Sequence, residues 1–148
     1  MKTILIIIIV LALAGVVDSA YALKQHYAPP DVSGCDFNAT ISCTAVNQSE
    51  YSAVAGVPVA GIGIAGYLLI ALLAATSLSA TKLSRKAVLA LPAVSLAALA
   101  IALCLTYIEL FVLKAVCPLC VVSQSLILVI TILSGSALVL ARKQSAQD

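Results

Sequence analysis

Apolar residues run along this chain in four long stretches, with polar residues gathered between them. The stretches cover roughly residues 3–21, 54–78, 87–113 and 118–141. Each holds about the 20 residues that an α-helix needs to cross ~30 Å of hydrocarbon. Because lipid offers the backbone no hydrogen-bond partners, each stretch is expected to be helical. The pattern therefore predicts four transmembrane helices.

The composition supports the same fold class. Hydrophobic residues make up 63% of the 148 residues and charged residues only 9%, and the mean hydropathy is +1.17. Soluble proteins are roughly 45–50% apolar and about 25% charged, so a water-soluble domain of this length is excluded. We predict an all-α membrane protein with one domain over residues 1–148, a four-transmembrane-helix bundle with an extracytoplasmic loop cap at residues 22–53.

The basic residues predict the orientation of the bundle. If the N-terminus is cytoplasmic, six of them lie inside, namely Lys2, Lys82, Arg85, Lys86, Arg142 and Lys143, and only Lys24 and Lys114 lie outside. This excess follows the positive-inside rule and puts both chain ends in the cytoplasm. A cleaved signal peptide is the rival interpretation of the first stretch, because residues 19–22 resemble a cleavage site.

Four of the five cysteines fall on the predicted outer side, which is the oxidising side of a cell membrane. Cys35 and Cys43 lie in the loop, and Cys117 and Cys120 lie at the start of the fourth helix. Two structural disulfides, a zinc site and a redox relay are the alternatives. Zinc sites use closely spaced pairs, which Cys35 and Cys43 are not. A disulfide across two intervening residues removes little entropy from the unfolded chain. We therefore favour a redox relay.

The Cys117-Pro-Leu-Cys120 motif stands where a thiolate is stabilised. Pro118 suits the first turn of a helix, so Cys117 is expected at the N-cap and Cys120 in the first turn. The N-terminus of a helix offers a partial positive charge and unpaired N–H groups. Both favour the thiolate, which is the attacking species in disulfide exchange.

The loop that holds Cys35 and Cys43 is expected to be mobile. It is polar and contains Pro29, Pro30, Ser33 and Gly34. Exchange requires sulfur atoms to approach one another in line. A moving pair could therefore carry oxidation from the membrane edge to a soluble protein.

These residues resemble the vitamin K epoxide reductase family in its bacterial, quinone-linked form. The resemblance spans about residues 15–125, and its order of a spaced Cys pair followed by a Cys-x-x-Cys is specific. The residues that carry it are Asp18–Leu23, Cys35-Asp36, Ile41–Cys43, Val46–Ser49, Gly56–Pro58, Gly66-Tyr67, Tyr107–Glu109 and Cys117–Cys120.

The resemblance implies a role for each cysteine of the relay. Cys120 would donate to a quinone, either ubiquinone or menaquinone, and Cys117 would exchange with Cys43. Cys35 would meet a separate periplasmic thioredoxin-like protein. Ser49 matches a small hydroxyl residue near the quinone. The implied function is a thiol:quinone oxidoreductase of the bacterial inner membrane that supports disulfide formation in exported proteins.

Two departures from the family pattern bear on the substrate. Gln124 stands where some members have Tyr, and the second apolar stretch lacks the Asn that binds quinone in them. Ser49 or Gln124 could instead donate a hydrogen bond to a quinone carbonyl. Vitamin K or quinone epoxide reduction is the alternative activity, and a four-span scaffold with structural disulfides is the non-enzymatic alternative.

Four further features yield expectations. Asp18 and Glu109 are expected to reach the interface and be solvated, with a proton relay as the alternative. Cys104 is expected to be a small buried apolar residue. The glycine run Gly61–Gly66 lies in a predicted span, where the small residues Ala60, Gly61, Ala65 and Gly66 would allow close helix packing rather than bind a nucleotide.

Overall fold

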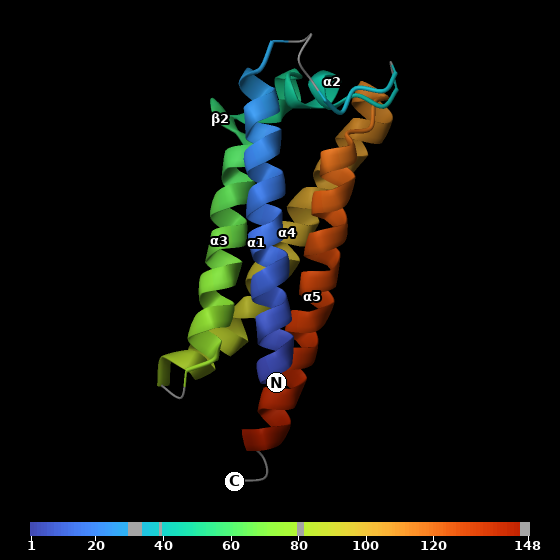
Figure 1. The fold of residues 1–148 in the computed structure, drawn as a ribbon. Helices are drawn as coiled ribbons and strands as arrows, with labels where there is room; N and C mark the ends of the chain where they lie inside the picture. The colour runs from blue at the N-terminus through green and yellow to red at the C-terminus, as the bar shows by residue number, and fades with distance from the viewer. Residues whose placement is uncertain (30–33, 39, 80–81, 146–148) are drawn as a thin grey trace.

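A computed structural model describes residues 1–29, 34–38, 40–79 and 82–145 (Figure 1). Its described part contains four helices long and apolar enough to cross a membrane, which confirms the predicted fold class. They are α1 (Lys2–Tyr27), α3 (Val59–Ser77), α4 (Lys82–Ile108), which continues as a π-helical turn η3 (Glu109–Leu113), and α5 (Pro118–Ser145). Pro118 opens α5, as its missing N–H predicts.

Several boundaries differ from the sequence-based expectation. Helix α4 begins at Lys82 rather than at residue 87, and α5 runs to Ser145 rather than to residue 141. Helix α1 continues beyond residue 21 to Tyr27, although this last turn is polar. Gln48 of the cap supports the turn, since its side-chain amide donates to the backbone oxygens of Gln25 and Ala28. The second span begins at Val59 rather than near residue 54, because residues 53–58 form a small hairpin.

The four long helices form a ring. Helix α1 packs against α3 and α5, and α4 packs against the same two helices, so α1 and α4 face one another across the bundle. The main core cluster draws on all four and includes Leu5, Ile8, Tyr67, Ile70, Leu91 and Ile130. Between α4 and α5 the fully buried hydroxyls of Ser95 and Ser134 lie 2.8 Å apart, and such interhelical bonds stabilise membrane bundles.

Glycine permits the close approach of α1 and α3, but not at the expected positions. A Cβ on Gly15 would lie 2.5 Å from the Tyr67 ring, and one on Gly63 would lie 2.9 Å from the Ser19 hydroxyl. A Cβ on Gly61 or Gly66 would meet no described atom within 4 Å. The expectation of close helix packing at Gly61 and Gly66 is therefore wrong.

A compact cap covers one end of the bundle (Figure 1). It contains the short helix α2 (Cys43–Asn47), a 3-10 turn η2 (Glu50–Ser52) and the hairpin strands β1 (Ala53–Val54) and β2 (Val57–Pro58). The hairpin turn uses Ala55 at φ 51° and Gly56 at φ 81°. Positive φ at both central residues is the geometry of the tightest hairpins, and it favours glycine.

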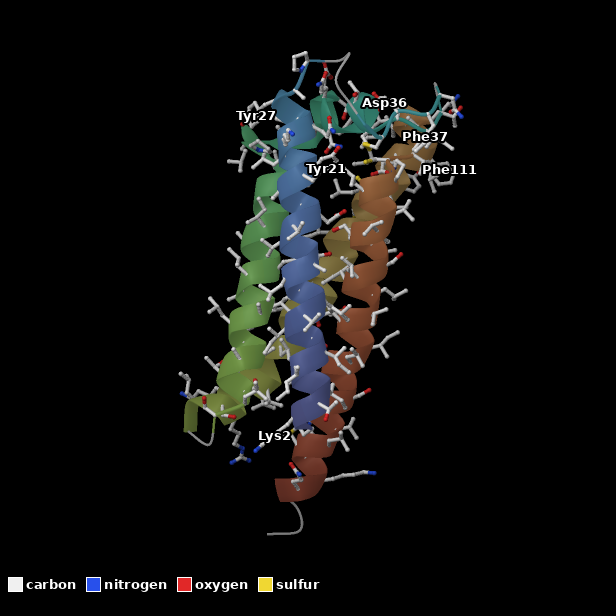
Figure 2. All side chains as sticks on the ribbon, viewed as in Figure 1. Lys2, Tyr21, Tyr27, Asp36, Phe37 and Phe111 are labelled. Carbon is white, nitrogen blue, oxygen red and sulfur yellow. A yellow bond between two sulfur atoms is a disulfide. The ribbon has the colours of Figure 1, made fainter. Side chains whose placement is uncertain are left out.

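Asp36 anchors the start of α2 to the segment before it. Its carboxylate accepts hydrogen bonds from the Ser42 hydroxyl (2.8 Å), the Thr44 amide (3.0 Å) and the Thr44 hydroxyl (2.6 Å). Figure 2 shows Asp36 and Phe37 at the capped end and Lys2 at the opposite end. These side-chain hydrogen bonds tie the start of α2 to the segment before it.

Candidate functional site

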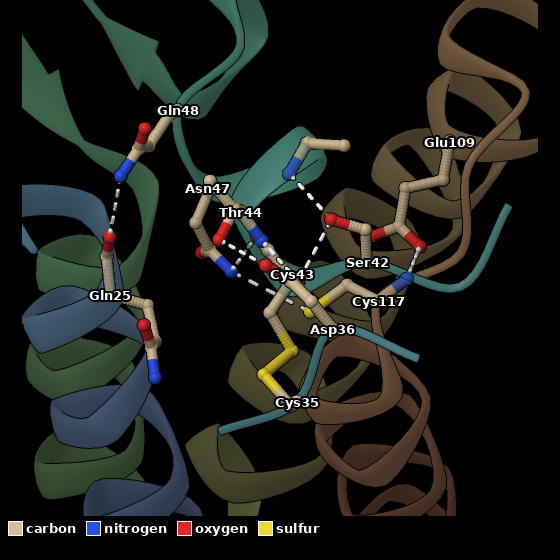
Figure 3. Close-up of a disulfide and its surroundings, with 11 residues drawn as sticks. Gln25, Cys35, Asp36, Ser42, Cys43, Thr44, Asn47, Gln48, Glu109 and Cys117 are labelled. Atoms are coloured by element: carbon tan, nitrogen blue, oxygen red, sulfur yellow. Dashed lines mark hydrogen bonds between the residues drawn. A yellow bond between two sulfur atoms is a disulfide. The ribbon is translucent and has the colours of Figure 1, made fainter. Parts of the chain in front are cut away.

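The structure brings the four predicted relay cysteines into one place. Cys35 and Cys43 form a disulfide with their Cα atoms 5.7 Å apart, and Cys117 and Cys120 are free thiols. Cys43 and Cys117 are both fully buried in one cluster, against which Cys35 and Cys120 pack. Figure 3 shows the disulfide beside Cys117. Cys104 lies elsewhere and is exposed on α4, so the expectation that it is buried is wrong.

Backbone hydrogen bonds hold the Cys35–Cys43 pair, called here the outer pair, against the Cys117–Cys120 pair, called the inner pair. Ile41 and Val116 form an isolated parallel β-bridge. The Val116 N–H donates to the Thr40 carbonyl at 2.7 Å, and the Ser42 N–H donates to the Val116 carbonyl at 3.2 Å. Each segment is directly followed by a relay cysteine, Cys43 or Cys117. Pro30 and Ser33, on which the expected mobility partly rested, lie outside the described residues.

Asn47 joins the two pairs through its side-chain amide. The amide donates to the Cys43 carbonyl at 3.1 Å and to the Cys117 sulfur at 3.5 Å, from a side chain that is only 8% exposed (Figure 3). The residue lies within the Val46–Ser49 stretch of the family pattern, but no role was expected for it. Its two bonds place a neutral donor where a thiolate would form.

Cys117 stands directly before the first turn of α5, as expected. The Val121 N–H donates to its carbonyl at 3.1 Å. The pKa of Cys117 is lowered chiefly because the Cys120 side chain hydrogen-bonds to its sulfur, and the backbone amides of Cys120 and Leu119 add to this. Burial and the nearby charge of Glu109 act in the opposite direction. The helix start therefore favours negative charge on Cys117.

Glu109 is part of this site rather than of the interface. It is only 5% exposed, so the expectation that it is solvated is wrong. Its Oε2 accepts the Cys117 N–H at 3.4 Å, and its side chain also hydrogen-bonds to Cys120. The π-helical turn η3 begins at Glu109 and ends at Leu113, and the next residue, Lys114, has a left-handed φ of 51°. This turn aims a carboxyl group at the Cys117–Cys120 pair.

A cavity of about 400 Å³ opens between the helices beside Cys120. Its walls are largely aliphatic, and the predicted residues Cys120, Ser49 and Gln124 all line it. The Ser49 hydroxyl donates to the Val46 carbonyl at 2.8 Å. Gln124 Oε1 is buried and has no hydrogen-bond partner among the described residues. An apolar cavity with a few polar groups suits a quinone ring. The unpaired Gln124 Oε1 can accept a hydrogen bond from a hydroxyl group in the cavity.

Two further polar residues line the cavity from α1 and α3. Asp18 of α1 is half-buried there, so it faces the cavity and not the interface as expected. Tyr67 of α3 donates its hydroxyl hydrogen bond to the Ser123 carbonyl at 2.8 Å. Both residues belong to the family-like stretches quoted above, but their sequence context gives no sign of a shared cavity.

Comparison with known proteins identifies the family of the chain. The family model described as "Vitamin K epoxide reductase family" matches residues 6–135. A search of curated proteins finds no match. The matched range includes most of α1, the cap, the cysteines and every cavity residue named above.

Proposed function

The chain belongs to the vitamin K epoxide reductase family, whose members are oxidoreductases, and we propose that it is a membrane thiol-disulfide:quinone oxidoreductase. In this proposal it takes two electrons from a separate thioredoxin-like dithiol and delivers them to ubiquinone or menaquinone. The observation that carries the proposal is that Cys43 and Cys117 are buried together while Cys120 lines the cavity. The two pairs thus lie in series between the cap surface and a space for the acceptor.

The first step is exchange between the partner and the outer pair. A partner thiolate attacks the Cys35–Cys43 disulfide, the partner becomes oxidised, and Cys35 and Cys43 become thiols. Cys43 is fully buried, whereas Cys35 is partly exposed. Because exchange needs access to the attacked sulfur, Cys35 is the atom that a partner can reach.

The second step passes the electrons inward. The Cys43 thiolate attacks Cys117 of an oxidised Cys117–Cys120 pair, and Cys35 then closes the outer disulfide again. The outcome is an oxidised outer pair with two inner thiols, which matches the bonding seen in the structure. The Asn47 amide beside Cys117 and the lowered pKa of Cys117 support its part in the exchange.

The third step is reduction of the quinone. Cys120 lines the cavity, and Ser49 and Gln124 line it too, so these three residues are the proposed quinone contacts. The quinone supplies the two-electron acceptor. The protein supplies a buried dithiol, an apolar enclosure and an unpaired amide oxygen on Gln124, which could accept from a hydroquinone hydroxyl.

We further propose that the capped end faces the oxidising side of a bacterial inner membrane, with both termini in the cytoplasm. Lys2, Arg85, Lys86, Arg142 and Lys143 belong to the ends of helices opposite the cap, whereas Lys24 and Lys114 belong to the capped end. Labelling of the reduced cysteines by a membrane-impermeant thiol reagent in oriented vesicles tests this orientation.

The activity test uses purified protein in detergent without oxygen. A reduced thioredoxin-like dithiol and a soluble ubiquinone analogue are added, and a menaquinone analogue follows if the first is not reduced. We expect Cys120→Ala to abolish the loss of quinone absorbance and Cys104→Ala, outside the cluster, to leave it unchanged. If neither quinone is reduced and the cysteines resist mild reductant, the scaffold alternative stands. Turnover of a quinone epoxide would instead support the epoxide reductase.

The exchange between pairs has its own test. With Cys35 and Cys120 both replaced by Ala, the two remaining relay cysteines have only each other as partners. We expect a Cys43–Cys117 disulfide, detected by mass spectrometry of linked peptides. Two unlinked thiols after mild oxidation would contradict the order of the relay.

A further inference from the structure

Two carboxyl groups line the cavity from opposite sides of the bundle. Asp18 lies on α1, and Glu109 lies where α4 passes into η3. Helices α1 and α4 face one another across the ring, because each packs against α3 and α5. The cavity between them therefore has one carboxyl group on each of two facing walls.

A quinone needs protons at two places. Its two carbonyl oxygens lie at opposite ends of the ring, and both become hydroxyl groups when it takes up two electrons. A single donor beside the cysteines reaches only one end. Cavity-facing carboxyl groups in a membrane span mark function by default, because they are costly to bury.

Resting on the function proposed above, we infer that Glu109 and Asp18 are catalytic residues that protonate the two carbonyl oxygens of the quinone. Glu109 takes the proton of the Cys120 thiol, to which it is hydrogen-bonded, and passes it to the near oxygen. Asp18 gives its own proton to the far oxygen.

The environment of Asp18 suits a proton donor. It faces a largely aliphatic cavity, and no Lys or Arg is among the described residues that line the cavity. A carboxyl group in such surroundings is held at least cost in its neutral form. Glu109 is also buried, but unlike Asp18 it has two hydrogen-bond partners among the described residues, the Cys117 N–H and the Cys120 side chain. Hydrogen bonds to a carboxyl group favour its charged form. The two groups thus begin the reaction in different protonation states.

Protons, electrons and charge balance in this scheme. Before the reaction Cys117 is a thiolate, Cys120 a thiol, Glu109 a carboxylate and Asp18 a carboxylic acid. The two sulfurs lose two electrons and form the Cys117–Cys120 disulfide. One S–H bond and one carboxyl O–H bond break, and two hydroxyl O–H bonds form. Glu109 ends as a carboxylate, and Asp18 regains from water the proton that Cys117 had released earlier.

Single-turnover kinetics test the inference in the full chain. Fully reduced protein is mixed with a ubiquinone analogue without oxygen, and quinone absorbance is followed. Because a positioned general acid contributes roughly 10²–10⁴-fold, Asp18→Asn and Glu109→Gln should each slow the reaction by about 10²-fold or more. Glu50→Gln is the matched control, since Glu50 is an exposed carboxylate of the cap that does not line the cavity.

Three readouts separate proton delivery from a structural role. Without quinone, Asp18→Asn should exchange with the dithiol partner at the wild-type rate. The infrared spectrum of quinone-free protein should show a carboxylic acid band that Asp18→Asn removes. Above the pH at which Cys117 ionises, the wild-type rate of quinone reduction should fall as pH rises, because the donor Asp18 must be protonated, and Asp18→Asn should flatten this fall. The other titratable groups facing the cavity are His26, Tyr51, Tyr67 and Cys120, and they remain in both profiles.

Clear results would overturn the inference. Asp18→Asn that reduces quinone at the wild-type rate, or that slows partner exchange as much as quinone reduction, removes Asp18 from proton delivery. Asp18→Ser gives the same test if the first variant does not fold. An inactive wild type would instead refute the proposed function itself. Active wild type with unaffected carboxyl variants would refute only this inference.

Discussion

Replacement of Asn47 by Leu tests whether its amide stabilises the thiolate of Cys117. Leu keeps the branched shape but removes the donor that lies 3.5 Å from the Cys117 sulfur. A hydrogen bond to a charged group contributes about 1.5–3 kcal/mol, and a long N–H···S bond belongs at the lower end. Because about 1.4 kcal/mol corresponds to one pH unit, the pKa of Cys117 should rise by roughly one unit.

The assay follows ultraviolet absorbance of the thiolate against pH. In a background with Cys35, Cys43 and Cys104 replaced by Ser, Cys117 and Cys120 are the remaining thiols. In the parent the pKa of Cys117 is lowered, so its thiolate should form below the pH at which an ordinary thiol ionises. Asn47→Leu should move that midpoint upward.

A matched variant controls for the loss of an amide from α2. Gln48→Leu changes the residue next to Asn47. The Gln48 amide donates to the Gln25 and Ala28 carbonyls and not to a cysteine. We expect its titration midpoint to stay with the parent. If Asn47→Leu also leaves the midpoint unchanged, the amide does not stabilise the thiolate, and its role is limited to the bond with Cys43.

Two further predictions concern the stability of the bundle and of the cap. Gly15→Ala places a methyl group 2.5 Å from the Tyr67 ring, and such overpacking should lower the free energy of unfolding by about 1–3 kcal/mol in detergent denaturation. Gly135→Ala, whose Cβ meets no described atom within 4 Å, should not lower it. Asp36→Ala frees the Thr44 amide, so loss of a cap bond of about 1 kcal/mol should speed hydrogen exchange at that amide severalfold. Unchanged exchange there would show that the carboxylate does not hold α2.

The sequence predicted the helical spans well because each lies in a run of apolar residues that lipid forces into a helix. It misplaced helix ends on both sides of the bundle. On the capped side the reason is that protein contacts replace lipid. Gln25 extends α1 because Gln48 binds its carbonyl. Val54 and Val57 resemble the start of a span, yet the Ala55–Gly56 turn makes them a hairpin.

The site was predictable as far as chemistry follows from a motif. The two cysteine pairs are recognised from their spacing in the sequence, and Pro118 indicates where the last helix begins. The contacts of Asn47 and Glu109 with Cys117 could not be predicted from a motif. They form only because the cap packs on the bundle and because η3 is a π-helical turn. The sequence around a polar loop residue, or around a carboxyl group near the end of a span, is the same whether its side chain faces solvent or contacts a sulfur atom.

The direction in which the Glu109 side chain points depends on the number of residues in the π-helical turn after α4. A wide turn accommodates one more residue than an α-helical turn, and such bulges often occur at functional sites. Leu110, Phe111 and Val112 within it are exposed, whereas Glu109 at its start is buried. Removing one residue from this stretch would leave the hydropathy of the span almost untouched. It would nevertheless rotate the carboxyl group relative to Cys117, so the length of this segment matters to the site independently of its composition.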